Sequence, residues 1–463
     1  MTTLALISAF PPARNSLNEY GFHLAKAFAR REDIDRIIIL ADIDDDLVEE
    51  IRISPKIEVW RVWEFNKISS AKNILKVLKD IRPDYALFNL QTASFGDKEI
   101  PAALGLLAPM LSQSANIPTG VIMHNLIDAV DLAKTNLAGN KWRQKLVGFA
   151  GTIINKALLK SGYMSVTLDS FLDILQDKYK SSNAFLVPHG SFNCEDEADI
   201  PRLDARPNRI VTMGKFGTYK KLERMIGAVQ TLNAGTFAAT PIELIIGGSD
   251  HPAVKGYMQD LKDQHAGDPN IIFHGYVAES AVPGFFKQGR IAVFDYDSTT
   301  GSSGVLHQAA TFGTPPIYPL MGDFIDVTER EGLRGFHYTP LDGESLTEMI
   351  EQALTDTPKA QHIADNNLSV SKGLSMDVIA SMHMGLLEQV EKKRFFVLRN
   401  SNKQALWLKP RYEFQAEDGI RDCLLSRGLG DVYKRQLHGR HRFHAYGTIR
   451  TGREETIFRF AKL

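Results

Sequence analysis

Two stretches in the second half of the chain decide the fold: VTMGKFGTYKKLERMIGAV at residues 211–229, and FDYDSTTGSSGVLHQAATFGTPPIYP at residues 294–319. Each begins with an apolar run typical of a β-strand, continues into a polar loop that contains glycine, and ends in a helical pattern. Backbone N–H groups of such a loop, together with the helix N-terminus, can hold a diphosphate. The two stretches therefore predict phosphate-binding loops on an α/β sheet.

The same alternation extends through most of the chain. In the first half, it predicts helices at 19–30 and 70–81 and strands at 4–10, 36–40, 56–62, 85–90, 119–124, 166–168 and 184–187. In the second half, it predicts helices at 345–355 and 375–393 and strands at 209–213, 243–246, 271–273, 291–294 and 314–318. Strands that alternate with helices indicate βαβ units and a parallel sheet.

A break in this pattern divides the chain. The segment CEDEADIPRLDARPN, residues 194–208, is acidic, carries two prolines and lacks periodicity. We expect a first domain at 1–195, a linker at 196–208 and a second domain at 209–395. The fold class is therefore α/β, with two Rossmann-like parallel-sheet domains that face a central cleft.

The tail, residues 396–463, stands apart from both domains. Residues 414–436, FQAEDGIRDCLLSRGLGDVYKRQ, resemble translated sequencing-adapter sequence. We expect the tail to be artefactual from about residue 414 and exclude it from the fold. The alternative is a genuine C-terminal extension.

Composition excludes several classes of protein. Of the 463 residues, 54 are Lys or Arg and 55 are Asp or Glu, so the net charge of −1 gives no support to nucleic-acid binding. The two cysteines, Cys194 and Cys423, do not form a disulfide framework, which favours a reducing, cytoplasmic location. We find no apolar run of the roughly 20 residues that a membrane-spanning helix needs.

Lys215 and Lys220 flank the first glycine-bearing loop. Cleavage of a sugar–phosphate bond leaves negative charge on the diphosphate, and fixed cations stabilise that charge in the transition state. The loop directly follows a strand, which favours this role over two solvated lysines. With the second loop, the pair predicts a nucleotide-sugar donor site.

The second loop, Thr299 to Gly304, precedes a predicted helix. Its glycines, Gly301 and Gly304, allow close approach of a ligand to the backbone. Its serines, Ser302 and Ser303, can bind phosphate, although capping of the helix explains them equally well.

Two segments of the first half face the predicted cleft. The loop after the first strand lacks the G-x-G-x-x-G pattern of nicotinamide-binding domains, which argues against a dehydrogenase. It offers Arg14, Asn15, Ser16 and Asn18 to an anionic or hydroxylated ligand, or it is a plain connection. His124 ends a strand at the edge where open α/β sheets bind ligands.

Two further segments have a structural and a functional reading. Residues 41–46, ADIDDD, contain the D-x-D spacing of some metal-dependent sugar transferases, but acidic surface loops are common, and we expect no metal. Residues 132–168 contain no Asp or Glu and mix basic with apolar residues. That mix suits peripheral contact with an anionic membrane, or an ordinary packed helix with basic residues outside.

Taken in order, these segments resemble the GT-B glycosyltransferases of the family 4, or group 1, type, over about residues 4–393. FPPARNS at 10–16 stands where that family has a proline- and glycine-rich first loop. VIMHN at 121–125 matches a strand that ends in a histidine close to the donor sugar. VPHG at 187–190 resembles the family's PNG turn before the linker.

The second half carries the donor motifs of that family. GKFGTYKK at 214–221 resembles its GR…EKG motif, which places Lys215 on the arginine and Lys220 on the lysine. IIGGSD at 245–250 resembles its GxGp loop, and FHGYV at 273–277 its f.G.v strand. TGSSGVLHQAATFGTP at 300–315 resembles its EGFG…EAma.G.P signature.

The resemblance implies roles for individual residues. The catalytic group comprises His124, Lys215 and Lys220. The acceptor enters past the first loop of the N-terminal domain. The donor-binding residues are Gly214, Gly247, Thr300, Gly301, Ser302, Ser303, Gly304 and Gln308.

Two positions depart from the family pattern. Thr300 and Gln308 stand where the family has glutamates near the donor sugar and the ribose hydroxyls, so Asp295 or Asp297 is a candidate substitute. The implied activity is hexosyl transfer from a nucleoside-diphosphate sugar to a hydroxyl acceptor, such as a glycan, lipid-linked sugar or small glycoside, with retention of configuration. The alternatives are a non-catalytic nucleotide-sugar-binding or partner protein and a GT-B epimerase or phosphorylase.

Overall fold

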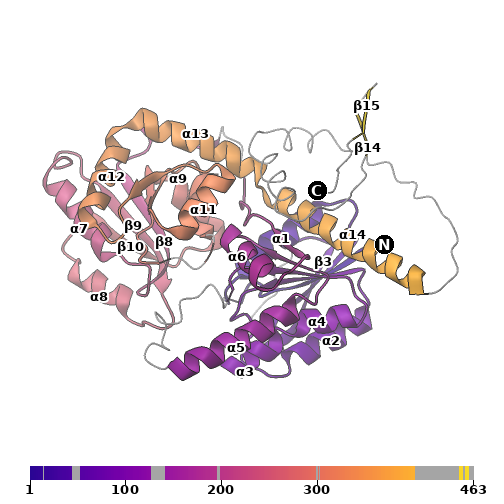
Figure 1. Ribbon diagram of the computed structural model, residues 1–463. Coiled ribbons are helices and arrows are strands. Elements are labelled where there is room, and N and C mark those ends of the chain that lie inside the picture. Colours follow the sequence, from indigo (N-terminus) through magenta and orange to yellow (C-terminus); the bar gives the residue numbers. More distant parts are fainter. Residues whose placement is uncertain are drawn as a thin grey trace. The chain divides into compact units, whose positions relative to one another are not determined.

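The computed structural model describes residues 1–13, 15–43, 53–126, 141–194, 199–298, 301, 303–401, 448–451 and 454–457. Met1–Trp407 form one compact unit and Leu408–Leu463 another. Within the described residues, the first unit contains two separate parallel sheets, each covered by helices on both faces (Figure 1). The prediction of two Rossmann-like parallel-sheet domains is confirmed.

The first sheet has the strand order β3-β2-β1-β4-β5-β6-β7 among the described residues. Its strands are β1 (Thr3–Ile7), β2 (Arg36–Ile43), β3 (Ile57–Glu64), β4 (Tyr85–Leu90), β5 (Thr119–Met123), β6 (Tyr163–Val166) and β7 (Ala184–Leu186). The helices between them are α1 (Asn18–Arg30), α2 (Ser70–Ile81), α3 (Glu99–Gly105), α4 (Ala108–Ser114), α5 (Lys141–Leu158) and α6 (Asp169–Asp173).

The second sheet has the order β10-β9-β8-β11-β12-β13. Its strands are β8 (Arg209–Phe216), β9 (Glu243–Asp250), β10 (Ile271–Gly275), β11 (Ile291–Val293), β12 (Pro316–Pro319) and β13 (Phe336–Tyr338). Its helices are α7 (Glu223–Ala234), α8 (Tyr257–Gln264), α9 (Val282–Lys287), α10 (Gly304–Thr311), α11 (Gly322–Glu331), α12 (Gly343–Thr355) and α13 (Thr357–Gly373).

Local sequence explains these elements. The strand β4, YALFNL, is buried along its whole length, as expected for a parallel strand covered on both faces. Helix α2 buries Ala71, Ile74 and Leu78, which share one face at helical spacing, and ends before a proline. Helix α12 begins at the cap Asp342, whose carboxylate accepts the N–H groups of two residues in its first turn, a contact worth about 1 kcal/mol.

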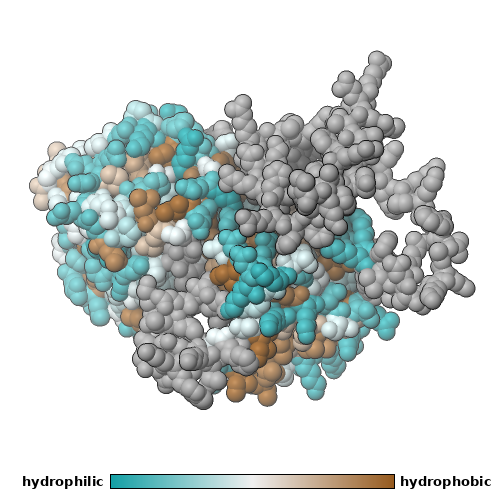
Figure 2. Space-filling view, in the orientation of Figure 1, coloured by the Kyte–Doolittle hydropathy of each residue, from teal (hydrophilic) through white to brown (hydrophobic). Residues whose placement is uncertain are grey.

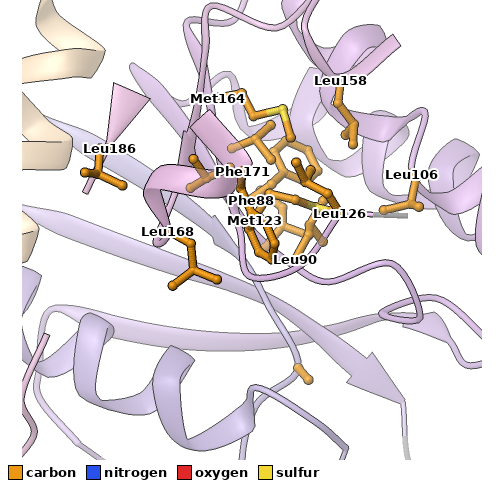
Figure 3. Packing of buried hydrophobic residues seen from close by; sticks show 14 of the residues in the cluster. Phe88, Leu90, Leu106, Met123, Leu126, Leu158, Met164, Leu168, Phe171 and Leu186 are labelled. Carbon is orange, nitrogen blue, oxygen red and sulfur yellow. The ribbon is translucent and has the colours of Figure 1, made fainter. Parts of the chain in front are cut away.

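The core of the first domain lies on both faces of its sheet. One face packs against α5 through residues such as Phe88, Met123, Leu158 and Met164 (Figure 3). Because every such residue is nearly inaccessible to water, deleting one of these large side chains is expected to cost about 2–5 kcal/mol. This packing holds the carboxyl ends of β4 and β5 in place.

The last helix of the first unit, α14 (Met376–Ser401), returns to the first domain (Figure 1). It packs against α1, β5 and β6, and it buries Ile379 and Leu387 in the second core of that domain. Arg30 pairs with Asp377 at the same contact. The sequence-based boundaries instead grouped this helix with the second domain, because helical periodicity does not show which sheet a helix covers.

The second unit contributes a two-stranded antiparallel pair, β14 (Thr448–Thr451) and β15 (Glu454–Ile457). The adapter-like residues 414–436 lie outside the described residues, so the expectation for them stays a prediction.

Candidate functional site

Each sheet reverses its winding next to its first strand, and the two reversals mark where a ligand is expected. In the first sheet the reversal lies between β1 and β4, and in the second between β8 and β11. Open α/β sheets bind ligands at such points, outside the carboxyl ends of their strands.

A pocket of about 180 Å³ lies at both of these points. Residues of the first domain line one side of it: Gln91, His124, Asn125 and His189. Residues of the second domain line the other side: Tyr219, Lys220, Tyr296, Gly301, Ser303 and Gly304. The pocket is smaller than the roughly 300–1,000 Å³ of drug-sized ligand sites, so it fits part of a large ligand.

Lys220 supplies the positive charge of the pocket. Its backbone pairs with Tyr296, so the two stretches that decided the fold lie side by side at this point. Its ammonium group lies 4.6 Å from the centre of the Tyr296 ring and 5.8 Å from that of Tyr219. Burial lowers the pKa of Lys220. Among the described residues, no carboxylate pairs with this ammonium group, so it is available to an anion.

Lys215 differs from Lys220 although the sequence treats them alike. Lys215 is the exposed residue next to the end of β8, and it does not line the pocket. Gly214 lies next to Lys220, and a Cβ atom there would stand 3.3 Å from Lys220 Cδ. The absence of a side chain at 214 therefore gives Lys220 its room. Gly247 packs against Val277 and Phe285 instead of lining the pocket.

The loop before α10 closes the second-domain side. Gly301, Ser303 and Gly304 line the pocket, while Thr300 and Ser302 lie outside the described residues. A Cβ atom at Gly301 would stand 3.3 Å from the His124 carbonyl oxygen, so the loop reaches the first domain. Helix α10 starts at Gly304, and its free N–H groups place partial positive charge at the pocket.

His124 follows β5 and takes part in a hydrogen-bond network that fixes its tautomer. Its Nε2 lies 2.7 Å from Asn89 Oδ1. The amide nitrogen of Asn89 donates to Ser8 Oγ and to the Leu17 carbonyl, so the amide oxygen must face the histidine. His124 Nε2 therefore carries the proton, and Nδ1 is an acceptor.

His124 is neutral in this position. Burial, followed by the nearby His189 and His383, lowers its pKa well below the usual value. Beside it, the Asn125 side-chain oxygen accepts the Thr92 N–H group, which leaves the Asn125 amide hydrogens as donors for the pocket. The first domain thus presents neutral hydrogen-bonding groups, whereas the second presents a cation.

The polar side chains of the first loop of the N-terminal domain, residues 11–18, make hydrogen bonds within the domain. Asn15 donates to the buried Asp42, and Asn18 donates to the Ala13 carbonyl and accepts the Glu19 N–H group. Ser16 is exposed, and Arg14 lies outside the described residues. The described residues of this loop do not line the pocket. Asp42, the first aspartate of the D-x-D spacing, also pairs with Arg61; Asp44 lies outside the described residues.

A carboxyl pair lies on the boundary between the domains. Glu279 of the second domain contacts His23 of α1, and its charge acts on Glu19, one turn earlier on the same helix. Burial and the charge of Glu279 raise the pKa of Glu19 to about 7, although Lys215 partly opposes the shift. At neutral pH, Glu19 therefore holds a proton more readily than an exposed glutamate does.

Asp295 and Asp297 do not replace the glutamates of the family pattern. Asp295 is buried, and its carboxylate accepts Arg224 at 2.6 Å and the Tyr338 hydroxyl at 2.8 Å. Asp297 pairs with the same arginine of α7. Both carboxylates thus anchor the strand end to α7 and do not line the pocket, which corrects the expectation that either one substitutes.

Gln308 is buried one turn into α10, and it does not line the pocket. Its side-chain oxygen has no hydrogen-bond partner among the described residues. A buried acceptor without a partner is costly, which favours a bound water as its partner.

Sequence reasoning missed several residues of the pocket. His189 stands in the VPHG turn, whose histidine was visible but was assigned to a turn. Tyr219 and Tyr296 neighbour predicted loops, and Gln91 follows β4 directly. A polar or aromatic residue at the carboxyl end of a strand next to the reversal would have been the available signal.

The segment at 132–168 is only partly described. Residues 141–158 form α5, and residues 132–140 lie outside the described residues. Ile153 of α5 is 49% exposed, and Ile100 of neighbouring α3 is 68% exposed; hydrophobic residues gather over this region in Figure 2. Among the described residues, no helix combines the length and apolarity that crossing a membrane requires.

The comparisons with known proteins agree with this arrangement. Residues 194–369 match the model of the family described as glycosyl transferases group 1. No curated protein matched the sequence. Three similar solved structures are enzymes or ligand complexes of this architecture.

Sucrose-phosphate synthase from Thermosynechococcus elongatus has a TM-score of 0.62 and 17% identity, covering 86% of this chain and 100% of the other. Anabaena Alr3699/HepE in complex with UDP and glucose has a TM-score of 0.60 and 16% identity, and the match covers 84% of this chain and 100% of that one. A UDP-forming trehalose-phosphate synthase from Burkholderia xenovorans has a TM-score of 0.59 and 10% identity, covering 84% and 100%. The chain therefore has the GT-B fold, and its residues 194–369 are similar to the family described as glycosyl transferases group 1.

Proposed function

We propose that this protein transfers a hexose from a nucleoside-diphosphate sugar to a hydroxyl acceptor, with retention of configuration. The observation that carries the proposal is Lys220, a partly buried ammonium group that no carboxylate of the described residues pairs with, in a pocket at both sheet reversals. A buried cation is costly unless an anion compensates it, and a diphosphate supplies that anion.

In this proposal the donor lies against the second domain. Its diphosphate contacts Lys220 and the N-terminus of α10, and its sugar enters the pocket between the domains. As the sugar–phosphate bond breaks, negative charge grows on the leaving diphosphate, and these fixed positive groups stabilise it without a metal ion. Lys215 is proposed as a second cation for the diphosphate, because it is exposed near the end of β8, the strand that leads to Lys220.

The acceptor approaches from the first domain. His124 and Asn125 offer hydrogen bonds to hydroxyl groups, and His124 stays neutral because burial lowers its pKa. The pocket shields the reacting carbon from water, which limits hydrolysis of the donor. A glycan, a lipid-linked sugar and a small glycoside all remain acceptor candidates. The exposed apolar residues of α3 and α5 support peripheral membrane contact for the lipid-linked case.

The test is a transfer assay with UDP-, GDP- and ADP-hexoses and a panel of hydroxyl acceptors, read out by mass spectrometry. Product is expected with one donor class, and Lys220→Met should lower kcat by about 10²–10³-fold, as the loss of one electrostatic contact typically does. Lys262→Met, which removes an exposed charge on α8, serves as the matched control. Near-normal turnover in Lys220→Met contradicts the assignment.

One observation favours a second candidate, a non-catalytic nucleotide-sugar-binding protein. Asp295 and Asp297 are both committed to Arg224, so no carboxylate lines the described part of the pocket. Tight nucleotide binding without product from any acceptor supports this candidate, and a detected product excludes it.

A further inference from the structure

His189 is a buried pocket residue with one free ring nitrogen. It follows β7, in the VPHG turn that precedes the linker. Its Nδ1 lies 3.0 Å from the Gly190 carbonyl oxygen, which can only accept, so Nδ1 carries the proton. In the neutral ring, Nε2 is then an acceptor.

The free nitrogen lies beside the second-domain loop. A Cβ atom at Gly304 would stand 3.4 Å from His189 Nε2, and both residues line the pocket. No hydrogen bond joins this nitrogen to any described residue. The His189 side chain, which belongs to the first domain, thus lies against Gly304 of the second domain. Its Nε2 atom is an acceptor for a ligand in the pocket.

A second histidine lies beneath the first. The rings of His307 and His189 stack with centres 5.0 Å apart. His307 Nδ1 lies 3.2 Å from the Ser303 carbonyl oxygen, and its Nε2 lies 2.8 Å from Glu331 Oε2. Both partners are acceptors, so this geometry is satisfied when His307 carries a proton on each nitrogen, as an imidazolium ion.

Glu331 balances that charge in the protein interior. Its side chain is 1% exposed and also accepts Arg330 at 2.7 Å. Burial alone would raise the pKa of Glu331, but the charges and hydrogen bonds of His307 and Arg330 outweigh it and lower the pKa to about 2. Glu331 is therefore ionised at neutral pH.

The imidazolium ion in turn affects His189. Burial is the main cause that lowers the pKa of His189, to about 4, and the charge of His307 acts in the same direction. His189 is neutral for this reason. His307 also holds the carbonyl of Ser303, the residue before α10, and so fixes the loop that faces the pocket.

We propose that His189 binds the donor sugar by accepting a hydrogen bond from one of its hydroxyl groups at Nε2, and that the His307–Glu331 pair positions it. The proposal rests on the proposed function. It also defines the sugar, because His124 Nδ1 and His189 Nε2 are both acceptors. A hydroxyl group can donate to them, whereas the carboxylate of a uronic acid cannot. Where the group at C6 meets these two nitrogens, we expect the pocket to bind a neutral hexose more tightly than a uronate.

The first test measures binding of UDP, UDP-glucose and UDP-glucuronate by calorimetry. The wild type is expected to bind UDP-glucose more tightly than UDP-glucuronate. His189→Leu should weaken the binding of UDP-glucose by about three- to tenfold, because one neutral hydrogen bond is lost. The affinity for UDP should stay unchanged. His189→Gln, whose amide can both accept and donate, should narrow the gap between the two sugars.

Gly304→Ala provides a second route, since it keeps both histidines and places a methyl group against His189. It should weaken the binding of UDP-glucose by a larger factor than the binding of UDP, whose diphosphate contacts the N-terminus of α10 in the proposed function. Equal losses for UDP and UDP-glucose in these variants overturn the role of His189, because a merely structural residue affects both. If no wild-type complex forms with UDP or with the GDP and ADP counterparts, the proposed function itself fails.

A further measurement needs no ligand. In ¹⁵N-histidine NMR spectra at pH 7, His307 is expected to be protonated on both nitrogens and His189 on Nδ1 only. Glu331→Gln should remove one proton from His307. A His189 ring protonated on Nε2 overturns the proposal while leaving the proposed function intact.

Discussion

Glu331 and Glu19 are both withdrawn from water near the boundary between the domains, yet their pKa values move in opposite directions. Burial raises the pKa of each. Glu331 has two cationic partners, and its pKa falls to about 2. Glu19 has the like charge of Glu279 beside it, with only Lys215 in opposition, and its pKa rises to about 7. The partners, and not burial alone, decide which carboxyl group is ionised.

The largest expected effect comes from breaking the compensated pair. Glu331→Gln removes the counter-charge of His307, while Arg330 keeps Asp169 as a partner, so we expect a loss of about 3–5 kcal/mol in the free energy of unfolding. Urea denaturation at pH 7 measures it. The double variant His307→Leu with Glu331→Leu should recover much of the loss, because it removes both charges. A change of less than about 1 kcal/mol in Glu331→Gln contradicts the buried ion pair.

The same ion pair, His307 with Glu331, should make the free energy of unfolding depend on pH in the acidic range. The pKa of Glu331 is lowered from 4.5 to about 2, so its stabilisation is present above pH 4.5 and is lost as the pH falls towards 2. The difference in unfolding free energy between wild type and Glu331→Gln should therefore shrink over that window. Urea melts at pH 5, 4 and 3 follow it, and a constant difference speaks against a lowered pKa.

Glu19 should behave in the opposite sense. Its folded pKa of about 7 lies above the usual 4.5, so the folded protein holds a proton that the unfolded chain releases, and stability falls as pH rises through this window. Glu19→Gln removes the carboxylate. It should therefore be more stable than wild type at pH 8, by on the order of 1–2 kcal/mol, and nearly equal at pH 5. If the free energies of unfolding of wild type and Glu19→Gln change with pH in the same way, the pKa of Glu19 is not raised.

The smallest effect is expected where a carboxylate has an arginine partner but remains in water. Glu58 pairs with Arg36 on neighbouring strands, and both side chains are 45% exposed. The hydrogen bond from Arg36 lowers the pKa of Glu58. Since solvent screens such a pair, Glu58→Gln should cost less than about 1 kcal/mol in urea denaturation at pH 7. A loss as large as that of Glu331→Gln would show that burial does not separate the two sites.

Periodicity predicted most of the parallel sheets. The helix at 70–81 and the strand at 85–90 lie where expected, because their apolar residues repeat clearly. β13 was missed, since three residues carry too little pattern, and so was α13, whose apolar face is weakly marked. α14 was predicted as a helix, but its packing on the first domain depends on a tertiary choice that periodicity does not encode.

Only those residues of the site that follow the end of a predicted strand could be found from the sequence. His124, Lys220 and Gly301 line the pocket, and each follows the carboxyl end of a strand; their roles stay predictions. The charge balance was not predictable. His307 and Glu331 are 24 positions apart and meet only after α10 and α11 pack. Asp295 and Asp297 looked available, but Arg224 of α7 holds both.

A diphosphate site at Lys220 is tested most directly by calorimetric binding of UDP, GDP and ADP to the wild type, Lys220→Met and Lys262→Met. One nucleotide is expected to bind the wild type and Lys262→Met alike, and to bind Lys220→Met at least about tenfold more weakly, because a charge-assisted contact is lost. Equal affinity for Lys220→Met, or no binding of any nucleotide to the wild type, would contradict a diphosphate site at Lys220.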